Sequence, residues 1–345
     1  MVPIHPHLPT VRKILREAKV PAFLVTDLIN IRYLTGIELS FGAILISANG
    51  MQLFVDGRYL EAAAESVYDG VDVLSFSTFA GTVRTFSRVG FESEQVTVLR
   101  YGIWKRKFKN TKFIQTSGVI AGFRRRKSPQ ELKAILEACD ITKTLLKRIP
   151  DLLIFGMTEK KLAFRIECLA REAGADGMAF DSIVAFGEHT ARPHHRPTDR
   201  KLRAGDIVQI DMGVRVRGYC SDYSRVYFTG AATTEQRRTL KALRLAKKAA
   251  ERLVRAGADT RSLDLAARRV LKDAGIEKEF CHALGHGVGL EIHEGVSISS
   301  KGVSKKLLTG EVITIEPGAY FVGRWGMRLE DTIIVRARAP SRVRD

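Results

Sequence analysis

The chain of 345 residues is longer than one hydrophobic core usually serves, and its 45% hydrophobic content indicates a well-packed globular protein of two domains. No apolar run is long enough to cross a membrane, and residues 1–10 lack the apolar segment of a signal peptide. The net charge of +18 would suit a nucleic-acid binder, but no helix-turn-helix, zinc-finger or aromatic stacking pattern accompanies it. We therefore interpret the charge as solvated surface and expect neither a specific nucleic-acid partner nor a membrane.

The cysteines favour a reducing compartment. They are Cys139, Cys168, Cys220 and Cys281, and none of them forms a CxxC pair. We expect free thiols in a cytoplasmic protein, because a disulfide framework or a zinc knuckle would need paired spacing.

The first 120 residues alternate short apolar runs with amphipathic ones. The pattern predicts strands over residues 22–26, 42–47, 51–56 and 71–76. It predicts helices over residues 10–19 and 57–66. We interpret residues 1–122 as an α/β domain and the basic segment 123–128 as a linker.

The second domain, residues 129–345, is predicted to begin with a well-marked helix. Ser128 suits the N-cap, Pro129 suits the first helical position, and Glu131 completes a capping box. Further helices, each ending on a glycine, are predicted over residues 158–174, 233–257 and 260–275. Strands are predicted over residues 181–187, 206–214, 219–228, 311–318 and 327–335. The mixture lacks a strict βαβ rhythm and so favours an α+β fold with a mostly antiparallel sheet.

Residues 282–294, HALGHGVGLEIHE, combine three histidines with three glycines. Glycines allow the backbone to approach another group closely, and imidazoles are common metal ligands. The segment is therefore a candidate metal site, with a polar loop as the alternative.

Acidic residues interrupt several of the predicted strands. Asp211, Glu316 and Glu330 lie among β-branched apolar residues, where a carboxylate is costly unless it is paired or binds a cation. A hairpin whose turn is centred on Val216 and Arg217 would pair Asp211 with Asp222, their Cβ atoms about 5 Å apart. Such a pair could span two divalent ions, which lie roughly 3.5–4 Å apart in co-catalytic sites.

Four segments, in this order and spacing, resemble the pita-bread metallopeptidases: IDMGVRVRGYCSDYSR, HALGHGVGLEIHE, TIEPG and MRLED. That family includes methionyl aminopeptidases, Xaa-Pro aminopeptidases, Xaa-Pro dipeptidases (prolidases) and creatinase. The segments IRYLTGIE and LFVDGRYLEAA resemble the N-terminal domain of the Xaa-Pro peptidases and creatinase. The resemblance covers almost the whole chain. It implies an α+β fold, with a pita-bread catalytic domain preceded by a smaller α/β creatinase-like domain.

The resemblance also implies a site for two divalent metal ions. Asp211 would chelate one ion, His286 and Glu316 would bind the other, and Asp222 and Glu330 would bridge both. Manganese is the usual metal in Xaa-Pro peptidases, with cobalt or zinc as substitutes. Four carboxylates and one imidazole suit a hard to borderline ion.

Further roles follow from the same resemblance. Glu316 would act as general base, His194 would face the substrate, and His293 would hydrogen-bond the scissile carbonyl. The segment FGEHTARPHH departs from the asparagine-containing loop usual before the substrate histidine, so His195 remains an alternative to His194.

Two residues indicate which branch of the family the chain resembles. His282 lies four positions before His286, and Arg328 lies two positions before Glu330. Both are typical of the Xaa-Pro peptidases, where they would contact the substrate or, alternatively, orient the metal ligands.

These observations predict a metal-dependent exopeptidase that hydrolyses the bond between an N-terminal residue and proline, a Xaa-Pro aminopeptidase. A Xaa-Pro dipeptidase is the alternative. A non-enzymatic pita-bread binding protein and a creatinase are disfavoured because the ligand set is complete. We expect proline-containing peptides as substrates and a homodimer.

Overall fold

The computed structural model describes residues 8–337, and its contacts divide the chain into two compact units. The division falls between Arg124 and Arg125, inside the segment predicted as a linker. Each unit has its own sheets and its own hydrophobic core.

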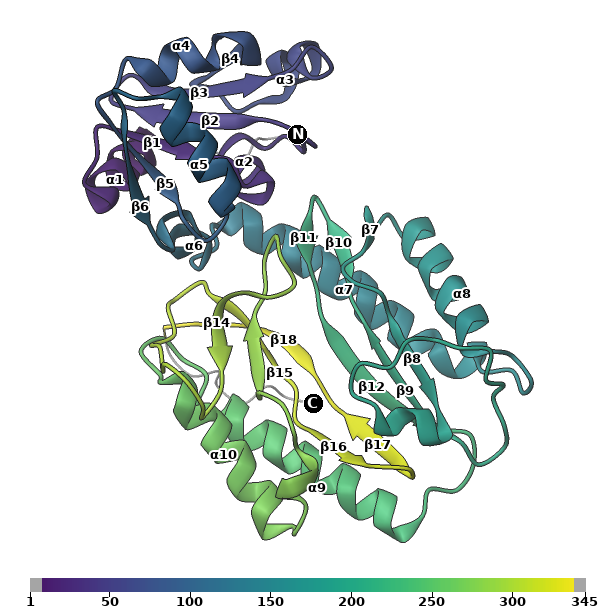
Figure 1. Cartoon of the computed structure of the whole chain (residues 1–345). Coiled ribbons are helices and arrows are strands. Elements are labelled where there is room, and N and C mark those ends of the chain that lie inside the picture. The colour runs from purple at the N-terminus through teal and green to yellow at the C-terminus, as the bar shows by residue number, and fades with distance from the viewer. Residues whose placement is uncertain (1–7, 338–345) are drawn as a thin grey trace. The chain divides into compact units, whose positions relative to one another are not determined.

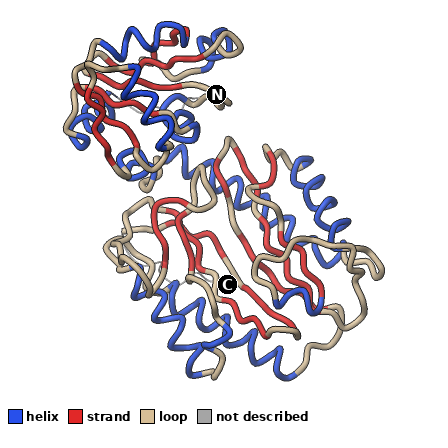
Figure 2. The backbone as a smooth tube through the Cα atoms, in the orientation of Figure 1, coloured by secondary structure: helices blue, strands red, loops and turns tan. Residues whose placement is uncertain are grey.

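The first unit is a six-stranded sheet with helices on both faces (Figure 1, Figure 2). The strand order is β4-β3-β2-β1-β5-β6, in which β2 runs antiparallel to β1 and β3 while the other neighbours are parallel. The strands are β1 (Ala22–Val25), β2 (Ala43–Ser47), β3 (Gly50–Val55), β4 (Val71–Ser75), β5 (Arg88–Glu92) and β6 (Lys112–Thr116). The α-helices are α1 (Leu8–Ala18), α2 (Leu28–Thr35), α3 (Leu60–Ser66), α4 (Phe79–Arg84), α5 (Val98–Lys107) and α6 (Val119–Arg124).

The central strand β1 serves two cores because its side chains alternate between the two faces of the sheet. Phe23 and Val25 pack in a core that includes residues of α1, α2, α3 and α6. Ala22 and Leu24 pack in the opposite core, which includes residues of α4 and α5. The structure confirms the predicted strands and the predicted helices around α1 and α3. It adds α2, α4, α5, α6, β5 and β6, which the sequence pattern did not predict.

The second unit consists of antiparallel strands with helix pairs on their outer side (Figure 1). Its strands begin with β7 (Gly177–Met178), β8 (Ile183–Phe186), β9 (Ile207–Met212), β10 (Val214–Val216), β11 (Tyr219–Cys220) and β12 (Tyr223–Phe228). They continue with β13 (Gly285–Gly287), β14 (Glu294–Ile298), β15 (Val312–Ile315), β16 (Gly318–Phe321), β17 (Trp325–Arg328) and β18 (Asp331–Ile334). The sheets have the orders β11-β10-β7, β12-β9-β8, β14-β13-β15-β18 and β16-β17.

The helices of this unit are α7 (Pro129–Leu152), α8 (Glu159–Glu172), α9 (Thr234–Glu251) and α10 (Thr260–Asp273). Helices α7 and α8 contact β8, β10 and β11, whereas α9 and α10 contact β14, β15 and β16. The predicted capping box at Ser128 and Glu131 is present, and Thr233 forms a second one with Gln236. An α/β unit followed by an α+β unit with antiparallel pairing confirms the predicted fold class.

The second unit is anchored at its start by two buried ion pairs. Arg125 Nε lies 2.7 Å from Glu311 Oε1, and the Glu311 side chain is 1% exposed. Lys127 Nζ lies 2.7 Å from Glu294 Oε1, with the two side chains 1% and 6% exposed. Arg125 and Lys127 therefore contact the second unit through these ion pairs, in agreement with the division of the chain at Arg125.

The predicted pairing of Asp211 with Asp222 is wrong. Asp211 of β9 pairs with Ser224 of β12, because the turn is formed by Arg217 and Gly218 and not by Val216 and Arg217. Both turn residues have positive φ, 50° and 81°, which a glycine accommodates readily. Moving the turn by one residue shifts the cross-strand partner of Asp211 by two.

All four cysteines are free, and Cys139 and Cys220 are buried. Within residues 8–337, no helix combines the length and the apolar character that crossing a membrane requires.

Candidate metal-binding active site

One pocket of the second unit collects every site residue that the sequence predicted. Its volume is about 730 Å³. The predicted residues in its wall are His194, Asp211, Asp222, His282, His286, His293, Glu316, Arg328 and Glu330. The pocket therefore brings together side chains that are up to 136 positions apart in the chain (330 − 194).

The five candidate metal ligands come from different strands or from the residues that flank them. Asp211 lies in β9 and His286 in β13. Asp222 directly precedes β12, Glu316 directly follows β15, and Glu330 lies between β17 and β18. These strands belong to different sheets, and the ligand side chains line the same pocket.

The ligand atoms are close enough to share cations. One ligand atom each from Asp222, His286 and Glu330 lies within 4.8 Å of the other two. His286 Nε2 is 3.5 Å from Asp222 Oδ2 and 3.5 Å from Glu316 Oε1. His286 Nδ1 is 3.1 Å from the carbonyl oxygen of Gly287, so Nδ1–H donates there and Nε2 faces the acids.

Burial makes these acids difficult to ionise in the absence of a cation. It raises the pKa of Asp222 to about 7, and the nearby Asp211 carboxylate adds to this effect. Burial also raises the pKa of Glu316 and of Glu330, with neighbouring carboxylates contributing. Burial alone would lower the pKa of His286, but the Asp222 and Glu316 carboxylates raise it above its usual value.

Arg328 is buried beside Asp211, and each of its three guanidinium nitrogens donates to a protein atom. It pairs with Asp211 Oδ2, donates from Nε to Ser224 Oγ at 2.9 Å and from NH1 to Tyr320 Oη at 2.6 Å. NH1 also donates to the carbonyl oxygen of Pro193 at 3.2 Å. The other oxygen of Asp211, Oδ1, is buried with no hydrogen-bond partner among the described residues. An unpartnered buried carboxylate oxygen in an acidic pocket fits a cation.

His282 is also held by protein atoms on both sides of its ring. Nδ1 lies 2.8 Å from the carbonyl oxygen of Ala283, and Nε2 lies 3.0 Å from Tyr320 Oη. Because burial and the charge of Arg328 lower the pKa of His282 to about 4, the ring is neutral. Nδ1–H therefore donates to Ala283, and the Tyr320 hydroxyl, which accepts from Arg328, donates to Nε2.

The remaining histidines differ in exposure. His293 is exposed, and its ring centroid lies 4.1 Å from that of His286. Burial and the neighbouring His286 and His194 lower the pKa of His293. His194 is exposed on the pocket wall, whereas His195 is buried with Nε2 2.9 Å from Glu159 Oε2. His194 is thus the histidine of this pair that is accessible to a ligand.

Two glycines of the motif at 282–294 are explained by close backbone contacts. A Cβ atom on Gly285 would lie 2.1 Å from the carbonyl oxygen of Thr314, and one on Gly287 would lie 2.1 Å from that of Glu294. The strand that carries His286 therefore packs between its neighbours at a separation that excludes any side chain at these two positions.

Sequence reasoning missed three residues that support the site. Tyr320 bridges Arg328 and His282, and Ser224 donates to Glu330 Oε2 at 3.0 Å. Glu159 binds His195 from the start of α8. Each lies in an ordinary strand or helix pattern, and only the tertiary contact reveals its role.

The sequence matches two family profiles that together span most of the chain. The profile of the metallopeptidase family M24 matches residues 133–337, and that of the creatinase/prolidase N-terminal domain matches residues 8–125. The chain belongs to metallopeptidase family M24.

Relatives with this two-part organisation align over nearly their whole length. A Xaa-Pro dipeptidase of Pyrococcus furiosus is 31% identical over 336 residues, which cover 96% of this chain and 95% of the relative. The structure of a Xaa-Pro dipeptidase from Bacillus anthracis superposes with a TM-score of 0.90 at 29% identity, covering 95% of this chain and 94% of that one. The structure of an X-Pro aminopeptidase from Thermotoga maritima superposes with a TM-score of 0.86 at 30% identity, covering 94% and 96%.

Proposed function

We propose that this M24 metallopeptidase hydrolyses the peptide bond between an N-terminal residue and proline. The observation that carries the proposal is the buried set of four carboxylates and one imidazole around an unpartnered Asp211 oxygen. Relatives of about 30% identity that are named for Xaa-Pro substrates support the substrate class.

In this proposal Asp211 would hold one divalent ion, His286 and Glu316 would hold the other, and Asp222 and Glu330 would be shared by both. The donor set suits manganese, with cobalt or zinc as substitutes. Two such ions, when bound, lower the pKa of water and polarise a peptide carbonyl.

The other pocket residues would handle the proton and the substrate. Glu316 lies 3.5 Å from His286 Nε2 and serves as general base for the attacking water. His194 and His293, which are both exposed in the pocket, are the donors that we assign to the substrate carbonyl. A Xaa-Pro amide has no N–H, so the pocket must recognise the proline ring by its shape and by its carbonyl oxygens.

Arg328 and His282 have a different part in the proposal. We predicted that both residues contact the substrate or, alternatively, orient the metal ligands, and their hydrogen bonds to protein atoms support the second role. We propose that Arg328 orients Asp211 and that His282 fixes Tyr320 beside it.

Two activities fit this site. We propose an aminopeptidase that accepts peptides longer than two residues, acting as a cytoplasmic homodimer. A Xaa-Pro dipeptidase is the second candidate, because dipeptidases and aminopeptidases are similar to this chain to nearly the same extent.

Metal analysis and peptide hydrolysis test the proposal together. The protein prepared with manganese should hold about two ions per chain, and a chelator should abolish hydrolysis. Asp211→Asn and Glu330→Gln should each lose metal and activity, whereas Glu188→Gln, an exposed partner of Arg200, should retain both. Full metal content and activity in both ligand variants would reject the site.

Substrate preference is measured in the same preparation. Xaa-Pro peptides of two, three and five residues separate dipeptidase from aminopeptidase, and light scattering measures the oligomeric state. A preference for Xaa-Ala over Xaa-Pro would reject the proline assignment.

A further inference from the structure

A second cluster of ionisable side chains lies outside the metal ligands, around Glu159 at the start of α8. Its side chain is fully buried and receives five hydrogen bonds. Oε1 accepts from the Phe186 N–H and from His189 Nδ1, both at 2.9 Å. Oε2 accepts from His195 Nε2 at 2.9 Å, from the Thr198 N–H at 2.9 Å and from the Thr198 hydroxyl at 2.7 Å.

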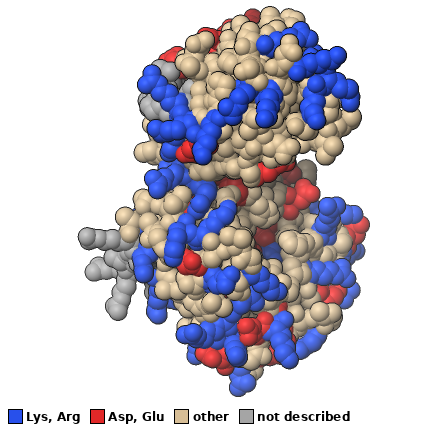
Figure 3. Space-filling view, turned by 60° about the vertical axis from the view of Figure 1, so that its left-hand side comes forward, with Lys and Arg blue, Asp and Glu red and all other residues tan. Residues whose placement is uncertain are grey.

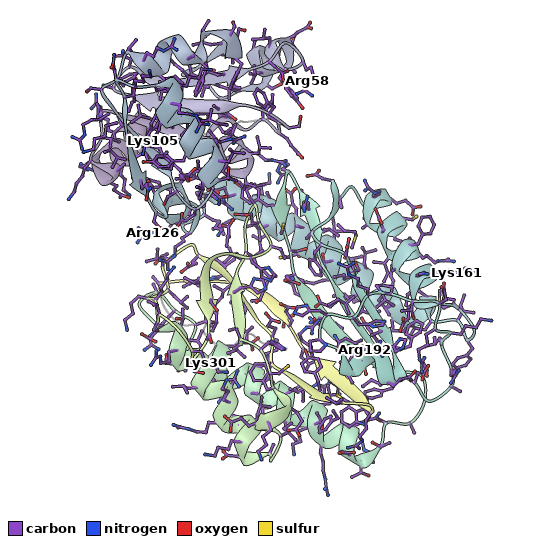
Figure 4. The ribbon with its side chains drawn as sticks, viewed as in Figure 1. Arg58, Lys105, Arg126, Lys161, Arg192 and Lys301 are labelled. Carbon is purple, nitrogen blue, oxygen red and sulfur yellow. The ribbon has the colours of Figure 1, made fainter. Side chains whose placement is uncertain are left out.

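Four of the five donors belong to one loop, and Phe186 is the last residue of the strand β8 before it. Residues 187–198 leave β8, form a short 3-10 helix (Gly187–Ala191) and carry His194 into the pocket wall. In Figure 4 the loop can be found by the label of Arg192, and the start of α8 by the label of Lys161, which lies two residues after Glu159. The single carboxylate of Glu159 therefore accepts hydrogen bonds from loop residues that precede His194 and from loop residues that follow it.

The residue next to His194 has a separate attachment. The carbonyl oxygen of Pro193 accepts from Arg328 NH1 at 3.2 Å, and the same guanidinium pairs with Asp211. With Pro193 held by Arg328 and His195 held by Glu159, the backbone is fixed on both sides of His194. The exposed His194 ring is then limited to rotation about its own side-chain bonds.

Glu159, His189 and His195 also have ligand atoms within 4.8 Å of one another, as in a cation site. Here, however, two backbone N–H groups and a hydroxyl already bind the carboxylate, so the imidazoles complete a set of donors around an anion. Burial would raise the pKa of Glu159, but the bonds from His195, Thr198 and the backbone outweigh it and lower that pKa. The carboxylate is thus stabilised as an anion without a metal.

We propose that Glu159 is a positioning residue that holds His194 in the pocket by binding both ends of its loop. The proposal rests on the proposed function, since His194 is there the donor to the substrate carbonyl. Within the segment FGEHTARPHH, His189 supplies a ring N–H to the same carboxylate.

A double-mutant cycle tests this role. Glu159→Gln keeps the size of the side chain but turns an amide donor toward the donors of the loop, so the loop should shift. We expect kcat/KM for a Xaa-Pro peptide to fall roughly ten- to a hundredfold, since small displacements of a substrate-positioning group cost that much. In a His194→Ala background the same substitution should cost less than about twofold, because the group that it positions is gone.

The loss of kcat/KM in Glu159→Gln should be divided between kcat and KM in the same proportion as the loss in His194→Ala. The manganese content should be unchanged. His195→Asn, whose shorter side chain falls short of Glu159, provides a second variant with the same expected pattern if Glu159→Gln folds poorly. Glu188→Gln is the matched control in the same loop, since the Glu188 side chain is 54% exposed and its partner Arg200 keeps a second ion pair with Asp206. Each variant is compared by its thermal unfolding midpoint before its kinetics are interpreted.

Additive losses in the cycle would overturn the positioning role. A third metal ion per chain that disappears in His189→Ala would also overturn it, in favour of a cation at this cluster. A wild-type enzyme that prefers Xaa-Ala would instead reject the proposed function, and the cycle can then be run on the peptide that the enzyme does cleave.

Discussion

Three of the four acids among the candidate metal ligands have distinct local partners. Asp211 pairs with Arg328, Asp222 faces His286, and Glu330 accepts from Ser224. Burial still raises the pKa of Asp222 to about 7 and raises that of Glu330, with neighbouring carboxylates adding to both shifts, so these partners do not fully stabilise the ionised acids. A proton on the acid and a divalent ion are therefore competing ways to neutralise the pocket.

This competition predicts how metal affinity depends on pH. Burial raises the pKa of Asp222 to about 7, and the neighbouring carboxylates raise the pKa of His286 above its usual value, so each group takes up a proton as the pH falls. Both protons must leave when a cation binds, so the dissociation constant for manganese should fall as the pH rises from 6 to 8. Calorimetric titration of the chelator-treated protein measures it, with Glu188→Gln as a variant that should follow the wild type. An affinity independent of pH over this range would contradict the prediction.

A buried acid in the first unit predicts a pH-dependent stability. Glu92 accepts from Asn30 Nδ2 at 2.8 Å, and burial raises its pKa from 4.5 to about 7. A raised pKa in the folded state means that the stabilising contribution is complete below pH 4.5 and is lost as the pH rises through 7. Glu92→Gln cannot ionise and keeps an oxygen that can accept from Asn30.

The stability of Glu92→Gln relative to the wild type should therefore increase between pH 5 and pH 8. Urea unfolding at both pH values, monitored on the metal-free protein, gives this difference. If the unfolding free energy of Glu92→Gln, relative to that of the wild type, instead decreases toward pH 8, the protein stabilises Glu92 better as an anion and the prediction is wrong.

At the scale of elements, the sequence predicted correctly those features that depend only on contacts between residues close together in the chain. The capping box of Ser128 and Glu131 fixed the start of α7, because both bonds lie within four residues of sequence. The turn between β10 and β11 was misplaced by one residue because Arg217, a non-glycine residue, adopts a positive φ beside Gly218. The candidate metal ligands were predicted from sequence motifs. Tyr320, Ser224 and Glu159 have partners 8 to 106 positions away and left no local pattern.

The glycines of β13 give a prediction for this element. A Cβ on Gly285 would meet the Thr314 carbonyl at 2.1 Å, so Gly285→Ala should force β13 away from β15 and displace His286. We expect a loss of about 1–3 kcal/mol in unfolding free energy, together with a lower manganese content. Gly177→Ala in β7 is the control, because its Cβ would approach only the Arg171 side chain, at 3.6 Å. Wild-type stability and metal content in Gly285→Ala would show that β13 can relax without moving the ligand.

At the scale of the whole molecule, the net charge of +18 is not confined to one unit on the face that Figure 3 draws. Figure 3 shows Lys and Arg over the surfaces of both units, with Asp and Glu among them. A distributed positive surface attracts phosphates without reading a sequence. We therefore predict weak nucleic-acid binding that is independent of sequence and decreases steeply between 50 and roughly 200 mM salt.

Fluorescence titration with two unrelated duplexes and with a single strand, at both salt concentrations, measures this binding. Heparin competition should remove it, and hydrolysis of Xaa-Pro peptides should be unaffected by the duplexes. Tight binding of one duplex at the higher salt concentration would favour a nucleic-acid function instead.

The ion pairs of Arg125 with Glu311 and of Lys127 with Glu294 determine where a fragment that contains only the second unit should begin. A fragment that began at Pro129, the first residue of α7, would keep Glu294 and Glu311 but lose the Lys127 and Arg125 cations beside them. Removing one partner of a buried pair costs about 3–5 kcal/mol, and Glu294 is the neighbour in sequence of His293 in the pocket wall. A recombinant catalytic fragment or a domain fusion should therefore start at Arg125, four residues before the first helix, for the pocket to retain its wall.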